Sequence, residues 1–131
     1  MSLRNILAAW FVVAGPSISF ACSPDIVRYN VDSAGAYLRR AAQASSDVLR
    51  REQRVREAQD YARLAYKALS DTQNELVTCE CVGPAEEFAY AATYARRAHD
   101  ESNPVELRDY IQRAIRGFRT GVDGVNAGLC R

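Results

Sequence analysis

Apolar residues recur three and four residues apart over most of the chain that follows residue 22. This spacing places side chains on one face of an α-helix, and no segment alternates apolar and polar residues for long enough to predict a β-strand. The first stripe predicts a helix from Pro24 or Val31 to about Ala44, and the second predicts a helix from Val48 onward. The inward positions are Val31, Ala34, Leu38, Ala41 and Ala42 in the first helix and Val55, Ala58, Ala62, Ala65, Leu69 and Leu76 in the second.

The second half of the chain has the same pattern. A third helix is predicted from Pro84 to about His99, and a fourth from Pro104, with Asn103 as its N-cap. Proline is favoured at the first helical position, where its missing N–H costs no hydrogen bond. The inward positions are Phe88, Ala91, Ala92, Ala95 and Ala98, followed by Leu107, Ile111, Ala114, Ile115, Phe118, Val122 and Val125.

The boundary between the first two helices allows two interpretations. Ser45, Ser46 and Asp47 can cap a second helix, because short polar side chains compete with the backbone inside a helix. A break there predicts an all-α fold, a small up-down four-helix bundle made of two antiparallel helical hairpins. The alternative is one long helix, because the heptad phase from Ala34 to Val55 continues through the break.

The two predicted hairpins resemble one another in sequence. Residues 37–41 read Tyr-Leu-Arg-Arg-Ala and residues 94–98 read Tyr-Ala-Arg-Arg-Ala, while Asp60-Tyr61 matches Asp109-Tyr110. These matches suggest an internal duplication. Helices rich in alanine and arginine also produce such matches by chance, so both origins stay open.

Residues 1–21 have the organisation of a secretory signal peptide. Arg4 precedes an apolar run over residues 6–15, and Ser19 and Ala21 put small residues at a cleavage site before Cys22. The run is too short to span a bilayer, which needs about 20 residues. We therefore expect a single domain over residues 22–131, periplasmic or secreted, with no integral membrane span. The alternatives are a lipid-modified Cys22, or a buried helix in place of the signal.

Charge excludes one class of partner. The chain has a net charge of +1, and removal of residues 1–21 leaves 16 basic and 16 acidic residues. Binding of nucleic acid depends on many unbalanced contacts between basic side chains and phosphates. A domain with equal numbers of basic and acidic residues is therefore not expected to bind polyanions in general.

Four cysteines in a small exported chain predict two disulfides. In an up-down bundle Cys22, Cys79, Cys81 and Cys130 all fall at one pole. Bridging Cys79 to Cys81 would strain the short ring between them, so we expect Cys22–Cys79 and Cys81–Cys130 to staple the bundle there. A zinc site is not expected, because Cys-x-Cys is not the usual ligand spacing and His99 lies at the opposite end of its helix. No cofactor is expected.

Residues capable of catalysis are scarce. His99 is the only histidine and is expected to be a surface residue at a helix end, and no nucleophile or phosphate loop accompanies it. The seven tyrosines are in excess, and amphipathic rings beside arginines are typical of binding surfaces. The candidate interaction surface consists of Tyr37, Arg39, Arg40, Tyr90, Tyr94, Arg96 and Arg97.

The sequence thus favours a non-enzymatic structural or protein-interaction module of the cell envelope or extracellular space, with an unknown protein partner. The alternative is a carrier that holds a lipid, cofactor or metal in the bundle core, since facing alanines and glycines can leave a cavity.

Overall fold

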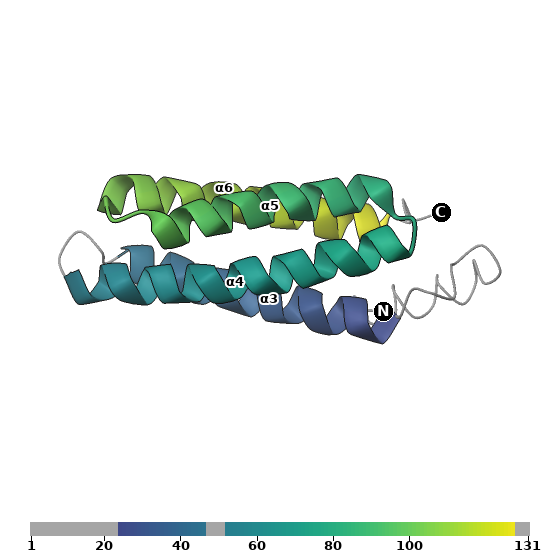
Figure 1. Ribbon diagram of the computed structural model, residues 1–131, viewed down its shortest axis with the longest axis horizontal. Helices are drawn as coiled ribbons and strands as arrows, with labels where there is room; N and C mark the ends of the chain where they lie inside the picture. The colour runs from purple at the N-terminus through teal and green to yellow at the C-terminus, as the bar shows by residue number, and fades with distance from the viewer. Residues whose placement is uncertain (1–23, 47–51, 128–131) are drawn as a thin grey trace.

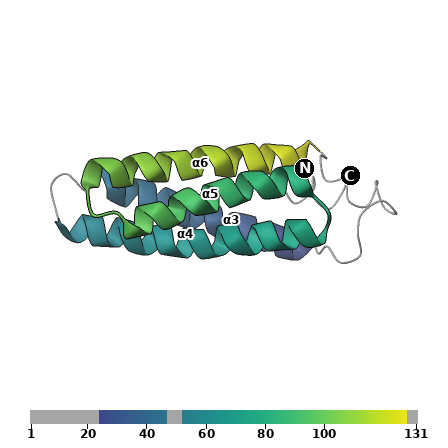
Figure 2. The same ribbon diagram turned by 45° about the horizontal axis from the view of Figure 1, so that its top comes forward.

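A computed structural model describes residues 24–46 and 52–127, which form four helices: α3 (Pro24–Ser46), α4 (Glu52–Thr78), α5 (Val82–Asp100) and α6 (Pro104–Asn126). Each helix packs against the next one in the chain, and α3 packs against α6. Successive helices run in opposite directions, with α3 diagonally across from α5 (Figures 1 and 2). The predicted all-α four-helix bundle is therefore confirmed. The predicted signal peptide, Cys22 and Cys130 lie outside the described residues.

Helices α3 and α4 are separate and pack side by side, so the alternative of one continuous helix is wrong. Ser45 and Ser46 belong to the last turn of α3. Their hydroxyls donate to the carbonyl oxygens of Ala42 at 2.9 Å and Gln43 at 2.7 Å. The prediction that these serines cap the second helix is thus wrong, and Asp47, the third residue of that predicted cap, lies outside the described residues. The two hydroxyls instead bond carbonyls three residues back, near the C-terminal end of α3.

The connection between α4 and α5 is a tight turn. The N–H of Cys81 donates to the carbonyl of Leu76 at 2.8 Å, and that of Glu80 donates to Val77 at 2.9 Å. Glu80 has a φ of 62° and is the one non-glycine residue with a positive φ in the described part of the chain. These features define a Schellman motif, in which the residue after the helix takes the left-handed conformation.

Helix α5 begins at Val82, two residues before the predicted start at Pro84. Pro84 is therefore the third helical residue. It is tolerated there because the first four N–H groups of a helix have no intrahelical acceptor. Helix α6 begins at Pro104 as predicted. The side chain of Asn103 accepts hydrogen bonds from the N–H groups of Val105 at 3.0 Å and Glu106 at 3.2 Å.

The apolar stripes meet in two hydrophobic clusters along the bundle, and Ile115 packs against both of them. Every predicted inward position of α4 and α5 is buried, and Phe88 packs edge to face against Phe118 with ring centroids 6.0 Å apart. Ala42, Ile115, Phe118 and Val122 were predicted to face inward but are only partly buried. They therefore lie at the edge of the core rather than within it.

Two glycines of α6 allow α5 to approach closely. A Cβ atom at Gly117 would lie 2.7 Å from Cδ1 of Tyr90, and one at Gly121 would lie 2.8 Å from Cε2 of Phe88. Real Cβ atoms essentially never come that close. Aromatic rings therefore occupy the space beside these glycines, and α6 continues helically through both.

The two hairpins also share their pattern of burial. Ala58, Ala62, Ala65 and Leu76 are buried in α4, and the residues 49 positions later in α6 are buried as well: Leu107, Ile111, Ala114 and Val125. This agreement fits the suggested duplication, although alternating up-down helices impose a similar pattern.

Candidate interaction surface

Tyrosine rings and guanidinium groups gather on the outer side of α5 and α6. Helix α5 supplies Tyr90, Tyr94 and Arg97, and α6 supplies Tyr110 and Arg113. The ring centroid of Tyr94 lies 4.8 Å from that of Tyr90 and 5.9 Å from that of Tyr110. The guanidinium carbons of Arg97 and Arg113 lie 5.1 Å and 5.4 Å from the centre of the Tyr94 ring. We call these five residues the tyrosine–arginine face.

Arg113 links the two helices of this face. It donates to the hydroxyl oxygen of Tyr94 at 3.3 Å, and its Nε lies 3.0 Å from a carboxylate oxygen of Asp109. The hydrogen bond from Arg113 lowers the pKa of Tyr94, because it stabilises the phenolate. The same bond raises the pKa of Arg113, and the Asp109 carboxylate adds to this effect. The rings are therefore held in place by charge as well as by packing.

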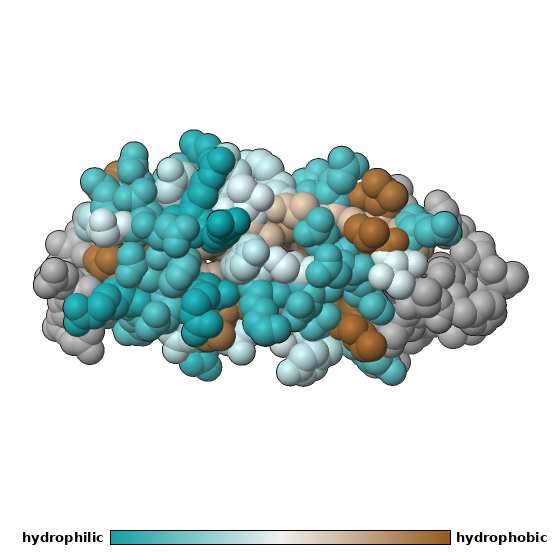
Figure 3. Space-filling view, viewed as in Figure 1, coloured by the Kyte–Doolittle hydropathy of each residue, from teal (hydrophilic) through white to brown (hydrophobic). Residues whose placement is uncertain are grey.

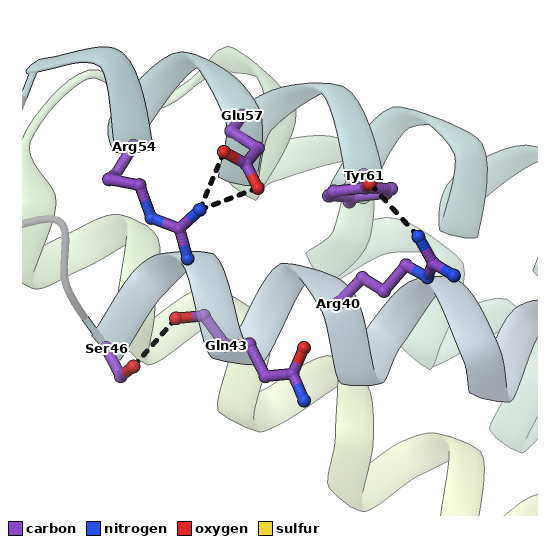
Figure 4. Close-up of polar contacts among 6 residues, drawn as sticks. All are labelled: Arg40, Gln43, Ser46, Arg54, Glu57 and Tyr61. Atoms are coloured by element: carbon purple, nitrogen blue, oxygen red, sulfur yellow. Dashed lines mark hydrogen bonds and ion pairs between the residues drawn. The ribbon is translucent and has the colours of Figure 1, made fainter.

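A second polar site lies between α3 and α4 and is shown in Figure 4. Arg40 donates to the hydroxyl of Tyr61 at 3.4 Å, and this bond raises the pKa of Arg40. One nitrogen of Arg54 donates to both carboxylate oxygens of Glu57 at 2.7 Å. A pocket of about 470 Å³ is lined by Ala36, Arg39, Arg40, Gln43, Arg54, Glu57 and Tyr61.

A second hollow, the α3–α6 groove, has a volume of about 410 Å³ and is mainly apolar in lining. Its lining residues are Gly35, Leu38, Arg39, Ala42, Gln43, Gln112, Ile115, Phe118 and Arg119. Arg39 and Gln43 also line the α3–α4 pocket, so the two hollows meet at these side chains.

The predicted surface residues do not form one surface. Tyr90, Tyr94 and Arg97 come together on α5, whereas Tyr37, Arg39 and Arg40 lie on the diagonal helix α3 (Figure 2). Arg96 is exposed and takes part in no ring contact that the described residues show. Sequence reasoning did not include Tyr61, Tyr110 or Arg113 in the surface. The paired Asp-Tyr motifs of the suggested repeat could have identified the two tyrosines.

The side formed by α4 and α5 differs from these faces. Figure 3 shows it as mostly hydrophilic, with strongly hydrophobic side chains towards both ends, the larger groups near the end where α4 joins α5. The large exposed apolar residues at that end of the bundle are Ile26, Tyr29, Val77 and Val82. The middle of the α4–α5 side is therefore not a candidate for apolar docking.

His99 is half-buried rather than a simple surface residue. Its Nδ1 lies 3.2 Å from the carbonyl oxygen of Gln59 on α4, so Nδ1 must carry the proton. The Gln59 side chain in turn donates to the carbonyl of Glu101 at 2.7 Å. His99 thus lies at the end of α5 as predicted, but it is partly covered and joins α5 to α4.

Cys79 and Cys81 are both buried, with 6% and 0% of their surface exposed, and no cysteine among the described residues is free. Their pairing stays a prediction, because Cys22 and Cys130 are not described. Within residues 24–46 and 52–127, no group of three or more His, Cys, Asp or Glu side chains could hold a metal ion. The helices in these ranges are also not long and apolar enough to cross a membrane.

Comparison of the chain with protein-family models, with curated proteins and with solved structures gives no match. Function must therefore be argued from the geometry of the faces.

Proposed function

We propose that the chain is an exported, non-enzymatic helical bundle that acts as a structural or protein-interaction module of the cell envelope or extracellular space. The observation that supports this proposal is the tyrosine–arginine face. Tyr90 is 44% exposed, Tyr94 and Tyr110 are half-buried, and Arg97 is exposed beside them. Tyrosine and arginine are among the residues that most often carry the binding energy of protein interfaces.

The face is suited to binding because it is already ordered. The rings pack on one another, and Arg113 is held between Tyr94 and Asp109. Side chains that are ordered before binding lose less conformational entropy when a partner docks, a cost of about 0.5–1.5 kcal/mol for each flexible side chain. A face that is both aromatic and ordered therefore favours specific protein binding.

The proposal includes export of the chain and two disulfides that staple the bundle. Cys22–Cys79 would join the start of α3 to the end of α4, and Cys81–Cys130 would join the start of α5 to the end of α6. Both bridges link helices that pack directly together, whereas exchanging the partners would link the diagonal pairs. Each bridge closes a loop of about 50 residues and would contribute roughly 3–4 kcal/mol in the loop-entropy picture.

Peptide mapping without reduction tests this arrangement. We expect the Cys22 peptide linked to the Cys79 peptide, and the Cys81 peptide linked to the Cys130 peptide. A free, acylated or intermolecular Cys22 would contradict the proposed staples.

The carrier alternative receives less support from the packing. It relied on alanines and glycines leaving a cavity between helices, but Tyr90 and Phe88 fill the space beside Gly117 and Gly121. The ring of Phe118 likewise lies 3.1 Å from where a Cβ of Gly35 would be. Native mass spectrometry of protein purified from its own host tests the alternative. A mass above that of the polypeptide would favour a carrier.

Site-specific photo-crosslinking tests the interaction proposal. A photoreactive phenylalanine analogue at Tyr90 should capture a discrete protein in the host. The same analogue at Arg56, an exposed position on α4, serves as the control and should not capture that protein. Identical products at both positions, or turnover of a substrate abolished by a single substitution, would contradict the proposal.

A further inference from the structure

The α3–α6 groove follows the seam along which the bundle is least closed. Helices α3 and α6 pack together less extensively than the three pairs that are consecutive in the chain. The floor of the groove combines the buried Leu38 with the partly buried Ala42, Ile115 and Phe118. Residues 35–43 span about 12 Å of helix axis at 1.5 Å per residue, which matches about two turns of a helix lying alongside.

The two walls of the groove carry the same chemistry. Arg39 and Gln43 line it from α3, and Arg119 and Gln112 line it from α6. Arg39 and Arg119 are exposed, and neither forms an ion pair with a carboxylate in the part of the chain that the structure describes. An apolar floor is thus flanked on both sides by a guanidinium group that makes no ion pair within the described residues.

Arg40 extends this positive charge beyond the groove. It lies next to Arg39 in the α3–α4 pocket, where its described partner is the neutral hydroxyl of Tyr61. Guanidinium forks match carboxylates with two parallel hydrogen bonds, so unpaired arginines favour an acidic partner.

We propose that the α3–α6 groove receives an acidic amphipathic helix from a partner protein. The apolar stripe of that helix lies on Leu38, Ile115 and Phe118, and aspartate or glutamate side chains on its two flanks meet Arg39 and Arg119. Helices that bind in grooves use apolar residues at positions i, i+3, i+4 and i+7 in this way. This inference rests on the proposed interaction function and adds the chemistry of a partner.

A protein helix fits this groove better than a small amphiphile does. Small-molecule sites enclose about 70–90% of the surface of their ligand. The α3–α6 groove is instead open along one side, as its exposed arginine and glutamine walls indicate. A partner helix needs only one face covered, and it reaches both arginines at once.

The test uses the full exported chain with its disulfides intact and a fluorescent 18-residue peptide. The peptide carries leucines at helical spacing, flanked by glutamates, and a matched peptide carries lysines in place of the glutamates. Sodium oleate serves as the small-amphiphile probe. Anisotropy gives the affinity, and amide NMR shifts locate the site.

Two pairs of substitutions carry the same change of charge. Arg39→Glu with Arg119→Glu reverses the two walls of the groove. Arg56→Glu with Arg63→Glu reverses two exposed arginines of α4 and is the matched control. Because all four positions are on the surface, we expect both proteins to fold. Ala42→Trp, which fills the groove without adding charge, is a third variant.

We expect the glutamate peptide to bind and to shift amides of α3 and α6, and the lysine peptide to bind at least tenfold more weakly. The groove reversal and Ala42→Trp should each weaken binding at least tenfold, and the α4 control less than twofold. Four results would overturn the inference: no binding, equal loss in both reversals, shifts confined to the tyrosine–arginine face, or oleate occupying the groove while the peptide does not.

The failure of this inference is distinguishable from failure of the proposed function. If crosslinking at Tyr90 captures a partner while the groove variants bind it normally, the inference fails and the interaction function stands. If crosslinking at Tyr90 captures nothing and the chain binds no protein, the proposed function itself fails.

Discussion

Glu80 gives a sharp test of the turn between α4 and α5. Its φ of 62° places a residue with a Cβ atom in the left-handed region, which costs roughly 1–2 kcal/mol relative to glycine. Glycine would remove this cost but would lose about 0.5–1 kcal/mol through the greater entropy of its unfolded chain. We therefore expect Glu80→Gly to be about 0.5–1 kcal/mol more stable than Glu80→Ala.

The alanine variant is the right reference, because it removes the carboxylate but keeps the Cβ atom. Glu80 stands between the end of α4 and the start of α5, so the two helix dipoles act on its charge in opposite senses, and both variants lose that contribution equally. Urea unfolding under non-reducing conditions, followed by circular dichroism, gives the two free energies of unfolding. A glycine variant no more stable than the alanine variant would refute the left-handed turn at Glu80.

Three further predictions test the packing, the capping and the electrostatics. Gly121→Ala places a Cβ atom 2.8 Å from the ring of Phe88. This substitution should lower the free energy of unfolding by about 1–3 kcal/mol in a urea titration. An unchanged free energy of unfolding would contradict the close approach of α5 and α6. Asn103→Ala removes the acceptor for two N–H groups at the start of α6 and should cost about 1 kcal/mol in the same assay, whereas an unchanged stability would exclude the cap. Ultraviolet titration should show the pKa of Tyr94 below its ordinary value, and in Arg113→Gln this pKa should return towards that value. Because the pKa of Tyr94 is lowered in the folded state, the contact with Arg113 stabilises the fold at pH values above the pKa of tyrosine in the unfolded chain. That stabilisation is lost as the pH falls through the pKa of Tyr94 in the folded state.

The fold was largely predictable because its signals are local. Leu69 and Leu76 continue the heptad pattern of α4, and both are buried in the core. Asn103 followed by Pro104 is a strong signal for the start of a helix, and α6 begins there. Ser45 and Ser46 were misassigned because a hydroxyl can bond either the free N–H groups at the start of a helix or carbonyls near the end of one. The sequence contains no feature that separates these two uses.

The tyrosine–arginine face was only partly predictable. Its α5 members, Tyr90, Tyr94 and Arg97, follow one another at helical spacing over about two turns, and that spacing is readable from the sequence. The contact of Tyr94 with Tyr110 and Arg113 depends on how α5 and α6 are rotated about their axes. The ring of Tyr90 occupies the space where a Cβ atom of residue 117 would lie, and this contact between α5 and α6 depends on the same packing.

The proposed function requires that the tyrosine–arginine face bind a protein. The most direct measurement is the affinity of the partner captured through Tyr90, by calorimetry, for the chain and for three variants. We expect Tyr90→Ala and Arg97→Ala each to weaken binding at least tenfold, or about 1.4 kcal/mol, and Arg56→Ala to change it less than twofold. Equal affinities for all four proteins would contradict the account.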